Sequence, residues 1–133
     1  MKNSIFDPVR KKRVACTPEE EVRQQLIAYL RDGLGYPESH MSCEYPLKRG
    51  KKSYRGDLVI FGNRMEPYLL AECKAPGVKL NIDVFEQIIR YNHMLKVKYL
   101  MVTNGETSYC AVYDSLENKY KFIGEIPEFD GFS

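Results

Sequence analysis

The stretch that decides the fold spans residues 55–74 and consists of RGDLVIFGNRMEPYLLAECK. An apolar run at each end of it predicts two strands, 55–61 and 68–74. The segment between them contains glycine, asparagine and proline and predicts a hairpin loop. Each strand also carries one carboxylate among apolar neighbours, Asp57 in the first and Glu72 in the second.

The pairing of these strands is expected to bring the two carboxylates together. If Phe61 lies opposite Tyr68 in an antiparallel hairpin, counting back along both strands places Asp57 opposite Glu72. Directly opposed side chains lie about 5 Å apart at Cβ, close enough for both to hold one cation. Residues two apart on a strand share a face, so Lys74 points the same way as Glu72. Three charged side chains therefore converge on one patch of the sheet.

The charge of this patch admits two interpretations. Burying two carboxylates near each other is costly unless a cation or hydrogen-bonded partners compensate. Lys74 supplies one positive charge, which leaves the patch negative, and a divalent metal ion would balance it. The alternative is an ordinary surface salt bridge at the strand ends. Spacing alone does not separate the two interpretations.

Helical signals stand on both sides of the hairpin. The segment Thr17-Pro18-Glu19-Glu20 predicts a helix start, with threonine as the N-cap and proline in the first turn. This helix is expected to end near Arg31, before two glycines. A second helix is expected from Asp83 to about Lys96, with apolar residues at helical spacing.

Further strands complete the expected sheet. Alternating residues predict a strand at 41–47, interrupted late by Pro46 and followed by a turn at 48–52. Short strands are expected at 99–103, 109–113 and 120–123, of which the last two extend the sheet or pair as a hairpin.

The order of elements is helix, three strands, helix, strand and an appendage. It predicts an α/β (α+β) fold with a mixed central sheet flanked by helices. Residues 1–16 carry no clear periodicity and are expected to form an N-terminal arm. Residues 17–133 are expected to form a single domain.

Composition limits the class of protein and the kind of metal. The chain has 133 residues, of which 44% are hydrophobic and 29% charged, as in one soluble domain. Its apolar runs are too short to cross a bilayer and no secretory signal opens it, so a cytoplasmic protein is expected. Four cysteines without a CxxC pair and only two histidines fit neither a zinc site nor a disulfide framework. Any metal would therefore have oxygen ligands, which indicates magnesium or manganese.

The distribution of charge is more informative than the net charge of +2. One basic cluster covers residues 11–13, and a second runs directly into Asp57. Either cluster alone is typical of a solvated surface, but a basic loop beside a carboxylate is what a phosphate-binding acidic site needs. The second cluster consists of Lys48, Arg49, Lys51, Lys52 and Arg55.

The spacing of the acidic residues is similar to that of a known family. Asp57, followed after a gap by Glu72-Cys73-Lys74 in an apolar strand, resembles the PD-(D/E)xK nuclease superfamily, whose core has the order of elements expected above. Gly56 replaces the proline of the name, a change that removes no ligand. On the following helix, Gln87-x-x-x-Tyr91 resembles a motif of the branch that contains RecB-like nucleases and the motor subunits of type I restriction enzymes.

The flanking segments narrow the resemblance. From about Phe6 to Tyr113 the chain resembles the N-terminal endonuclease domain of type I restriction enzyme R (HsdR) subunits. The segments that carry this similarity are FDPVRKK at 6–12, TPEE at 17–20 with VRQ at 22–24, AECKAP at 71–76 and VTNG at 102–105.

The resemblance implies roles for the site residues. Asp57 and Glu72 would hold one or two Mg²⁺ or Mn²⁺ ions, with the carbonyl oxygen of Cys73 as a further ligand. Lys74 would orient the attacking water or offset charge in the transition state, and the alternative is a salt-bridge partner.

The second helix is expected to contribute as well. Gln87 and Tyr91 are four residues apart and share a helix face. The resemblance implies that they reach the metal-bound water or a DNA phosphate. The alternative is that they cap the sheet with ordinary hydrogen bonds.

The first helix is expected to supply another acidic group. On a helical wheel Glu19 falls within the stripe of Val22, Leu26 and Tyr29, whereas Glu20 points away and suits capping. Glu19 is therefore the predicted site residue. The alternative is that both carboxylates only favour the positive end of the helix dipole.

The expected function is a metal-dependent DNA endonuclease domain, a Mg²⁺-dependent deoxyribonuclease of the type I restriction kind. Tyr54, Arg55 and the basic loop are the candidates for contacts with the DNA backbone. Neither a recognition helix nor a Walker motif occurs, so the motor, specificity and modification subunits of a restriction system would lie elsewhere. The chain would be a solitary protein or a fragment of a longer R subunit. The alternatives are a non-catalytic DNA- or protein-binding module on a nuclease-like scaffold, and a structural domain.

Overall fold

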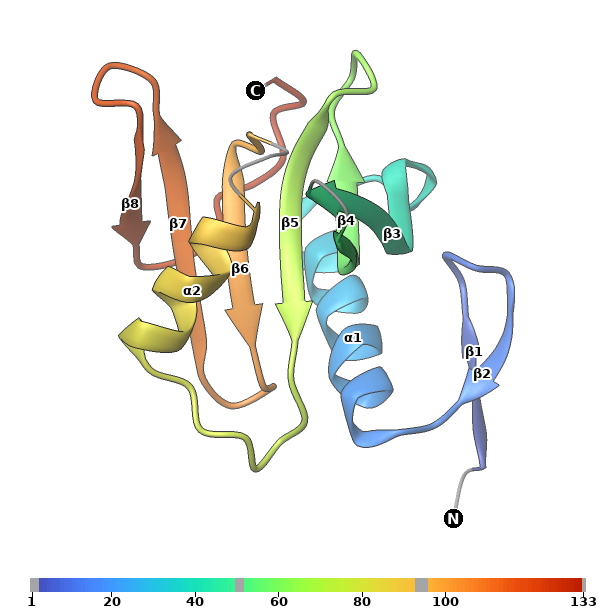
Figure 1. Cartoon of the computed structure of the whole chain (residues 1–133). Coiled ribbons are helices and arrows are strands. Elements are labelled where there is room, and N and C mark those ends of the chain that lie inside the picture. The colour runs from blue at the N-terminus through green and yellow to red at the C-terminus, as the bar shows by residue number, and fades with distance from the viewer. Residues whose placement is uncertain (1–2, 50–51, 93–95, 133) are drawn as a thin grey trace.

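A six-stranded sheet with a helix on each face forms the body of the molecule (Figure 1). The computed structural model describes residues 3–49, 52–92 and 96–132, without the side chains of residues 48, 49, 52–54, 91 and 92. The elements are β1 (Ser4–Asp7), β2 (Lys12–Ala15), α1 (Pro18–Ala28), β3 (Met41–Arg49), β4 (Lys52–Phe61), β5 (Pro67–Cys73), α2 (Ile82–Asn92), β6 (Tyr99–Thr103), β7 (Ser108–Asp114) and β8 (Lys119–Ile123).

The sheet is mixed, as the sequence predicts. Its strand order is β3-β4-β5-β6-β7-β8, with β5 and β6 parallel and every other neighbouring pair antiparallel. The parallel pair is joined by α2, because a parallel connection must cross from one end of the sheet to the other. β7 and β8 form a hairpin and also extend the sheet, so both expectations for them hold.

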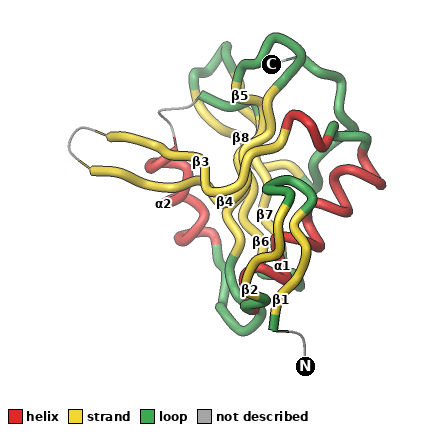
Figure 2. The backbone as a smooth tube through the Cα atoms, turned by 90° about the vertical axis from the view of Figure 1, so that its right-hand side faces the viewer, coloured by secondary structure: helices red, strands yellow, loops and turns green. Residues whose placement is uncertain are grey.

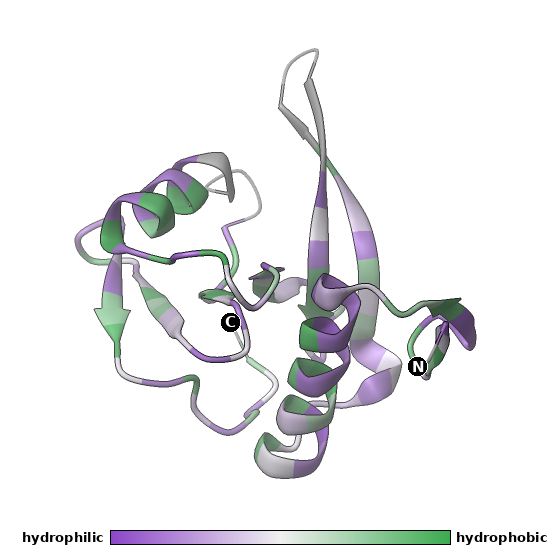
Figure 3. Cartoon of the chain, turned by 90° about the horizontal axis from the view of Figure 1, so that it is seen from below, coloured by the Kyte–Doolittle hydropathy of each residue, from purple (hydrophilic) through white to green (hydrophobic). Residues whose placement is uncertain are grey.

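Burial on both faces explains why β5 and β6 are almost wholly apolar. Leu69 and Ala71 pack with α1 on one face, whereas Leu70 packs with Phe85 of α2 on the other. All of these side chains are shielded from solvent, so the two cores share the central strands. Bands of hydrophobic and hydrophilic residues along both helices are visible in Figure 3. None of the helices in the described ranges has the length and apolar character needed to span a membrane.

The start of α1 confirms the predicted cap. The Thr17 hydroxyl accepts a hydrogen bond from the backbone N–H of Glu20 at 3.1 Å, and proline occupies the first turn. Beyond Ala28 the helix continues as one wider turn, Tyr29–Gly33, before Gly35 takes a positive φ of 77°. A glycine adopts this conformation without the steric cost that other residues meet.

The prediction that Pro46 interrupts β3 is wrong. The strand continues to Arg49, because β3 lies at the edge of the sheet, where the missing N–H of proline leaves no partner strand unsatisfied. The irregularity falls two residues earlier, at Glu44. Its φ is +54°, and the pairing passes from Cys43↔Leu58 to Tyr45↔Gly56 without it.

The N-terminal arm has regular structure that the sequence analysis did not predict. β1 pairs with β2 in an antiparallel hairpin, separate from the main sheet, with Lys11 at φ +55° in the turn. Each strand is four residues long, too short for alternation to stand out in the sequence. The longer hairpin of β3 and β4 projects from the body of the molecule (Figure 2).

Candidate functional site

The site is built where β4 and β5 lie side by side. Pairing of Leu58 with Ala71 and of Ile60 with Leu69 is the register expected for the hairpin, and its continuation places Asp57 opposite Glu72. At Phe61 the register shifts by a bulge, so Phe61 pairs with Pro67 and not with Tyr68. The shift lies at the far end of the hairpin and leaves the carboxylates aligned.

Asp57 closes the hairpin at this point with its side chain. Its Oδ2 accepts a hydrogen bond from the backbone N–H of Cys73 at 2.7 Å. The side chain thereby takes a backbone donor of β5 as its partner. This bond fixes the carboxylate beside the end of β5, where Glu72 and Lys74 also lie.

The carboxyl groups of Asp57 and Glu72 are in contact. Burial, the negative charge of Asp57 and a hydrogen bond between the two side chains together raise the pKa of Glu72 to about 8. Lys74 and Arg23 lie close enough to act against this rise in the pKa. A divalent cation bound between the two groups would act against this rise and favour the ionised form of Glu72.

The chemistry of these donors fits a hard divalent cation. The carboxyl groups of Asp57 and Glu72 lie side by side, and a positive charge next to them would favour ionisation of Glu72. The Cys73 carbonyl, a predicted ligand, belongs to the same stretch of backbone, and that assignment stays a prediction. Within residues 3–49, 52–92 and 96–132, no three His, Cys, Asp or Glu side chains gather as a metal cluster. Any ion here would thus take further oxygen donors from backbone or solvent.

The expectation that Glu20 points away from the buried face of α1 is wrong, whereas the place of Glu19 in the site stays a prediction. Glu19 is exposed, whereas Glu20 is only 6% exposed. The buried stripe of α1 includes Glu20, Arg23 and Ile27, and Tyr29 is 48% exposed. Val22 and Leu26 of the expected stripe are buried, but Glu20 is buried through its ion pair with Arg10, a contact that helical periodicity does not show. Glu20 donates its backbone N–H to the Thr17 cap, and its side chain is buried.

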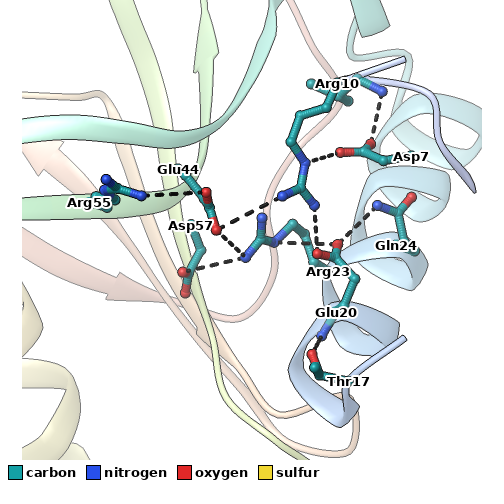
Figure 4. A network of polar contacts seen from close by, with 10 residues as sticks. Asp7, Arg10, Thr17, Glu20, Arg23, Gln24, Glu44, Arg55 and Asp57 are labelled. Atoms are coloured by element: carbon teal, nitrogen blue, oxygen red, sulfur yellow. Dashed lines mark hydrogen bonds and ion pairs between the residues drawn. The ribbon is translucent and has the colours of Figure 1, made fainter. Parts of the chain in front are cut away.

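Glu20 belongs to a network of ion pairs with two arginines (Figure 4). Its Oε1 accepts from Arg10 Nη2 at 2.5 Å, and its Oε2 accepts from Gln24 Nε2 at 3.1 Å. Arg10 lies in the turn of the β1–β2 hairpin and also donates to the fully buried Asp7. Burial would raise the pKa of Asp7, but its hydrogen bonds from Arg10 and the Val9 N–H hold that pKa below the usual value.

Arg23 extends the network from α1 to the candidate site. Its Nη2 lies 3.9 Å from Asp57 Oδ1 and 4.0 Å from Glu44 Oε1. The same Glu44 carboxylate is 3.9 Å from Arg10 and 3.7 Å from the exposed Arg55. Sequence reasoning missed Arg23 and Glu44. The sequence held a signal for Arg23, because Arg23 lies three residues after Glu20 on the same helix face. Glu44 belongs to the network through a backbone irregularity at its own position, which the sequence does not indicate.

The predicted DNA-binding residues are only partly described. Arg55 is exposed and pairs with Glu44 beside Asp57. Lys51 lies outside the described residues, as do the side chains of the other members of the set: Lys48, Arg49, Lys52 and Tyr54. Their backbones lie on the projecting β3–β4 hairpin, with Arg49 paired to Lys52.

The helical pair Gln87 and Tyr91 lies on α2, across the sheet from α1. Gln87 is exposed, and the side chain of Tyr91 is outside the described part of the chain. Their proposed approach to the carboxylates stays a prediction.

Fold and site together define a mixed α/β domain with paired carboxylates beside a lysine and buried arginines. The sequence profile described as the type I restriction enzyme R protein N terminus matches residues 18–127, so the chain belongs to this family. No curated protein sequence matches the chain significantly.

Among solved structures, the chain is similar to the fragment structure of a putative HsdR subunit of a type I restriction enzyme from Vibrio vulnificus YJ016. The TM-score is 0.57 and the sequence identity 17%, over 85% of this chain and 24% of that chain. At this identity the similarity shows a common fold. The chain spans about a quarter of that relative's length.

The two neighbouring glutamates of α1 give a matched pair for a stability test. Glu20→Ala is expected to lower the free energy of unfolding by about 3 kcal/mol, because it leaves two mostly buried guanidinium groups without their shared carboxylate. Glu19→Ala changes only an exposed side chain and is expected to stay within about 0.5 kcal/mol of the wild type. Urea unfolding followed by circular dichroism measures both. Equal effects of the two substitutions would show that the network does not stabilise the fold.

The raised pKa of Glu72 predicts how stability depends on pH. A carboxyl group that binds its proton more tightly in the folded state gives stability that is complete below pH 4.5 and lost as pH rises to about 8. In metal-free buffer, Glu72→Gln is therefore expected to stabilise the chain by on the order of 2 kcal/mol at pH 8, with a smaller gain at lower pH. Urea unfolding across this range tests it. Destabilisation by Glu72→Gln at pH 8 would mean that the carboxylate serves as a salt-bridge partner.

Proposed function

We propose that this domain is a metal-dependent DNA endonuclease of the type I restriction R-subunit kind, with a PD-(D/E)xK active site. The observation that carries the proposal is the contact between the carboxyl groups of Asp57 and Glu72. Burial and this contact together raise the pKa of Glu72. Holding two partly buried carboxyl groups together costs the fold stability once both are ionised. The arrangement becomes favourable when a cation binds between them.

In the proposed mechanism the chain's own groups bind and orient the reactants. Asp57, Glu72 and the Cys73 carbonyl would hold the Mg²⁺ or Mn²⁺ ion, which supplies a Lewis acid for the scissile phosphate and activates water. Lys74 would orient the attacking water or offset the charge that develops on the phosphate. Glu20 would hold the arginines that border the carboxylates.

Binding of DNA would use the projecting hairpin. Arg55 is exposed on β4 two residues before Asp57, so a phosphate bound there lies near the carboxylates. The basic residues toward the tip of the same hairpin would add contacts with the DNA backbone that do not depend on sequence. Gln87 and Tyr91 are proposed to approach the same phosphate from α2.

Partners are proposed from the family alone. R subunits belong to restriction systems, so motor, specificity and modification subunits are the proposed partners, and the cytoplasm is the proposed location. The reaction in the cell would then depend on delivery of DNA by those subunits.

The second candidate is a non-catalytic DNA- or protein-binding module on the same scaffold. The observation that favours it is the ion-pair network, because Arg10 and Arg23 already balance part of the negative charge. Under this alternative the carboxylates would need no metal. It does not account for the raised pKa of Glu72, which Lys74 and Arg23 offset only in part.

Metal binding and DNA cleavage are tested together. Calorimetric titration with Mn²⁺ is expected to show binding by the wild type and at least tenfold weaker binding by Asp57→Ala. Lys74→Ala is expected to retain the metal while nicking of supercoiled plasmid falls by about a hundredfold or more, because a charge that acts in the transition state is lost.

Matched controls use the same substitutions elsewhere on the surface. Asp32→Ala and Lys79→Ala each remove an exposed charge away from the carboxylates and are expected to behave like the wild type. If Asp57→Ala binds Mn²⁺ as the wild type does, the metal site is refuted. If Lys74→Ala binds the metal and still nicks plasmid at the wild-type rate, the proposed role of the lysine is refuted.

A further inference from the structure

Glu44 extends the row of acidic residues at the site onto a third strand. The strand pairing on either side of it places Glu44 of β3 opposite Asp57 of β4. Asp57 in turn lies opposite Glu72 of β5. Like charges that lie opposite each other on neighbouring strands repel, so the pairing of β3 with β4 gains no stability from Glu44.

The backbone conformation at Glu44 is also unfavourable. Its φ is +54°, which costs free energy in a residue with a side chain, whereas glycine adopts it freely. Strain of this kind is common at functional sites, where the surrounding contacts impose it. Glu44 lies inside a strand, but the other non-glycine residues with positive φ in the described ranges lie in turns or loops: Lys11, Met65, Lys96 and Asn118.

Three arginines from three elements surround the Glu44 carboxylate (Figure 4). Its Oε1 lies 3.9 Å from Arg10 Nη1 of the β1–β2 turn and 4.0 Å from Arg23 Nη2 of α1. Its Oε2 lies 3.7 Å from Arg55 Nη1 of β4. One oxygen therefore faces the two mostly buried arginines, and the other faces an exposed arginine.

The three arginines depend on Glu44 to different degrees. Arg10 and Arg23 each lie closer to another carboxylate, that of Glu20. They therefore keep an ion pair in the absence of Glu44. For Arg55, the pair with Glu44 is the only ion pair within the described part of the chain.

Arg55 is also the proposed DNA contact two residues before Asp57. Its side chain is 74% exposed, so a phosphate can reach it from solvent. A guanidinium binds carboxylate and phosphate oxygens with the same donors. A phosphate at Arg55 therefore competes with Glu44 for those donors, and the negative charge of Glu44 repels it at short range.

We propose that Glu44 is an internal competitor of DNA, which occupies Arg55 in the free chain and is displaced from it when a phosphate binds. This inference rests on the proposed nuclease function and adds to it a contact that lowers the affinity of the domain for DNA. Arg10 and Arg23 hold the competing carboxylate in place through its other oxygen. DNA binding at the site then requires further contacts that offset the loss of the Glu44–Arg55 pair.

Replacement of Glu44 by glutamine tests the competition, because it removes the charge and keeps the size of the side chain. Fluorescence anisotropy of a short labelled DNA duplex, titrated with the full chain at low salt with Ca²⁺, measures the affinity. Glu44→Gln is expected to bind the duplex about fivefold more tightly than the wild type. The matched control is Glu117→Gln, which removes a similarly exposed glutamate from its pairs with Lys119 and Lys121 and is expected to stay within about twofold of the wild type.

A second background distinguishes competition for Arg55 from general repulsion of DNA. In an Arg55→Gln chain, the further change Glu44→Gln is expected to raise the affinity by less than about twofold, because the contested arginine is absent. An equal gain with and without Arg55 would overturn the proposal. Weaker binding of DNA by Glu44→Gln would also overturn it, since Glu44 would then position Arg55 for DNA.

A glycine variant guards against loss of folding. Glycine suits the positive φ at this position, so Glu44→Gly is expected to keep the circular dichroism spectrum of the wild type and to show the same gain in affinity. A folded Glu44→Gly chain with the DNA affinity of the wild type would contradict the competition.

The outcomes separate this inference from the function on which it rests. DNA binding that ignores Glu44, in a chain whose metal binding depends on Asp57, would remove the competition and leave the nuclease proposal. A gain that requires Arg55, in a chain that binds no metal, would support the competition and refute the nuclease proposal. If none of these chains binds the duplex, the competition is overturned together with the proposed role of Arg55 in DNA binding.

Discussion

The contact between two carboxyl groups, one from β4 and one from β5, is the constraint on which the site depends. The apolar register of the hairpin imposes it, because Leu58 and Ile60 must face the same core as Ala71 and Leu69. A slip of one residue would expose that core and also separate Asp57 from Glu72. The packing that stabilises the sheet is therefore the same packing that forces two acidic groups together.

Charged residues from elements far apart in the sequence surround this contact. The β1–β2 hairpin contributes Arg10, α1 contributes Glu20 and Arg23, and the irregular backbone of β3 contributes Glu44. Alternating charges along this path stabilise one another in partly buried surroundings, where screening by solvent is weak. The N-terminal hairpin is thus an integral part of the site, although it is separate from the main sheet.

Much of the fold could be predicted from local signals in the sequence. Thr17-Pro18 marked the start of α1, and the apolar runs around Asp57 and Glu72 predicted two strands. The order of the elements followed from their positions along the chain. The family assignment agrees with the resemblance that these motifs carried. Membership of the chain in the PD-(D/E)xK superfamily and the catalytic roles of its site residues remain predictions.

What sequence could not supply was direction and long-range pairing. Glu20 is buried by an ion pair with Arg10 of the separate β1–β2 hairpin, and helical spacing carries no sign of that contact. Glu44 joins the site through a positive φ that no residue pattern announced. The strand through Pro46 depended on its position at the sheet edge, which is a property of the tertiary structure.

The most direct test of the central claim is the anomalous scattering of Mn²⁺ in crystals grown at pH 8, close to the raised pKa of Glu72. The account predicts one strong peak between the carboxyl groups of Asp57 and Glu72, at coordination distance from an oxygen of each. It also predicts that this peak is lost in crystals of Asp57→Ala. Ordered carboxyl groups still in contact with each other, with no manganese between them, would contradict the account.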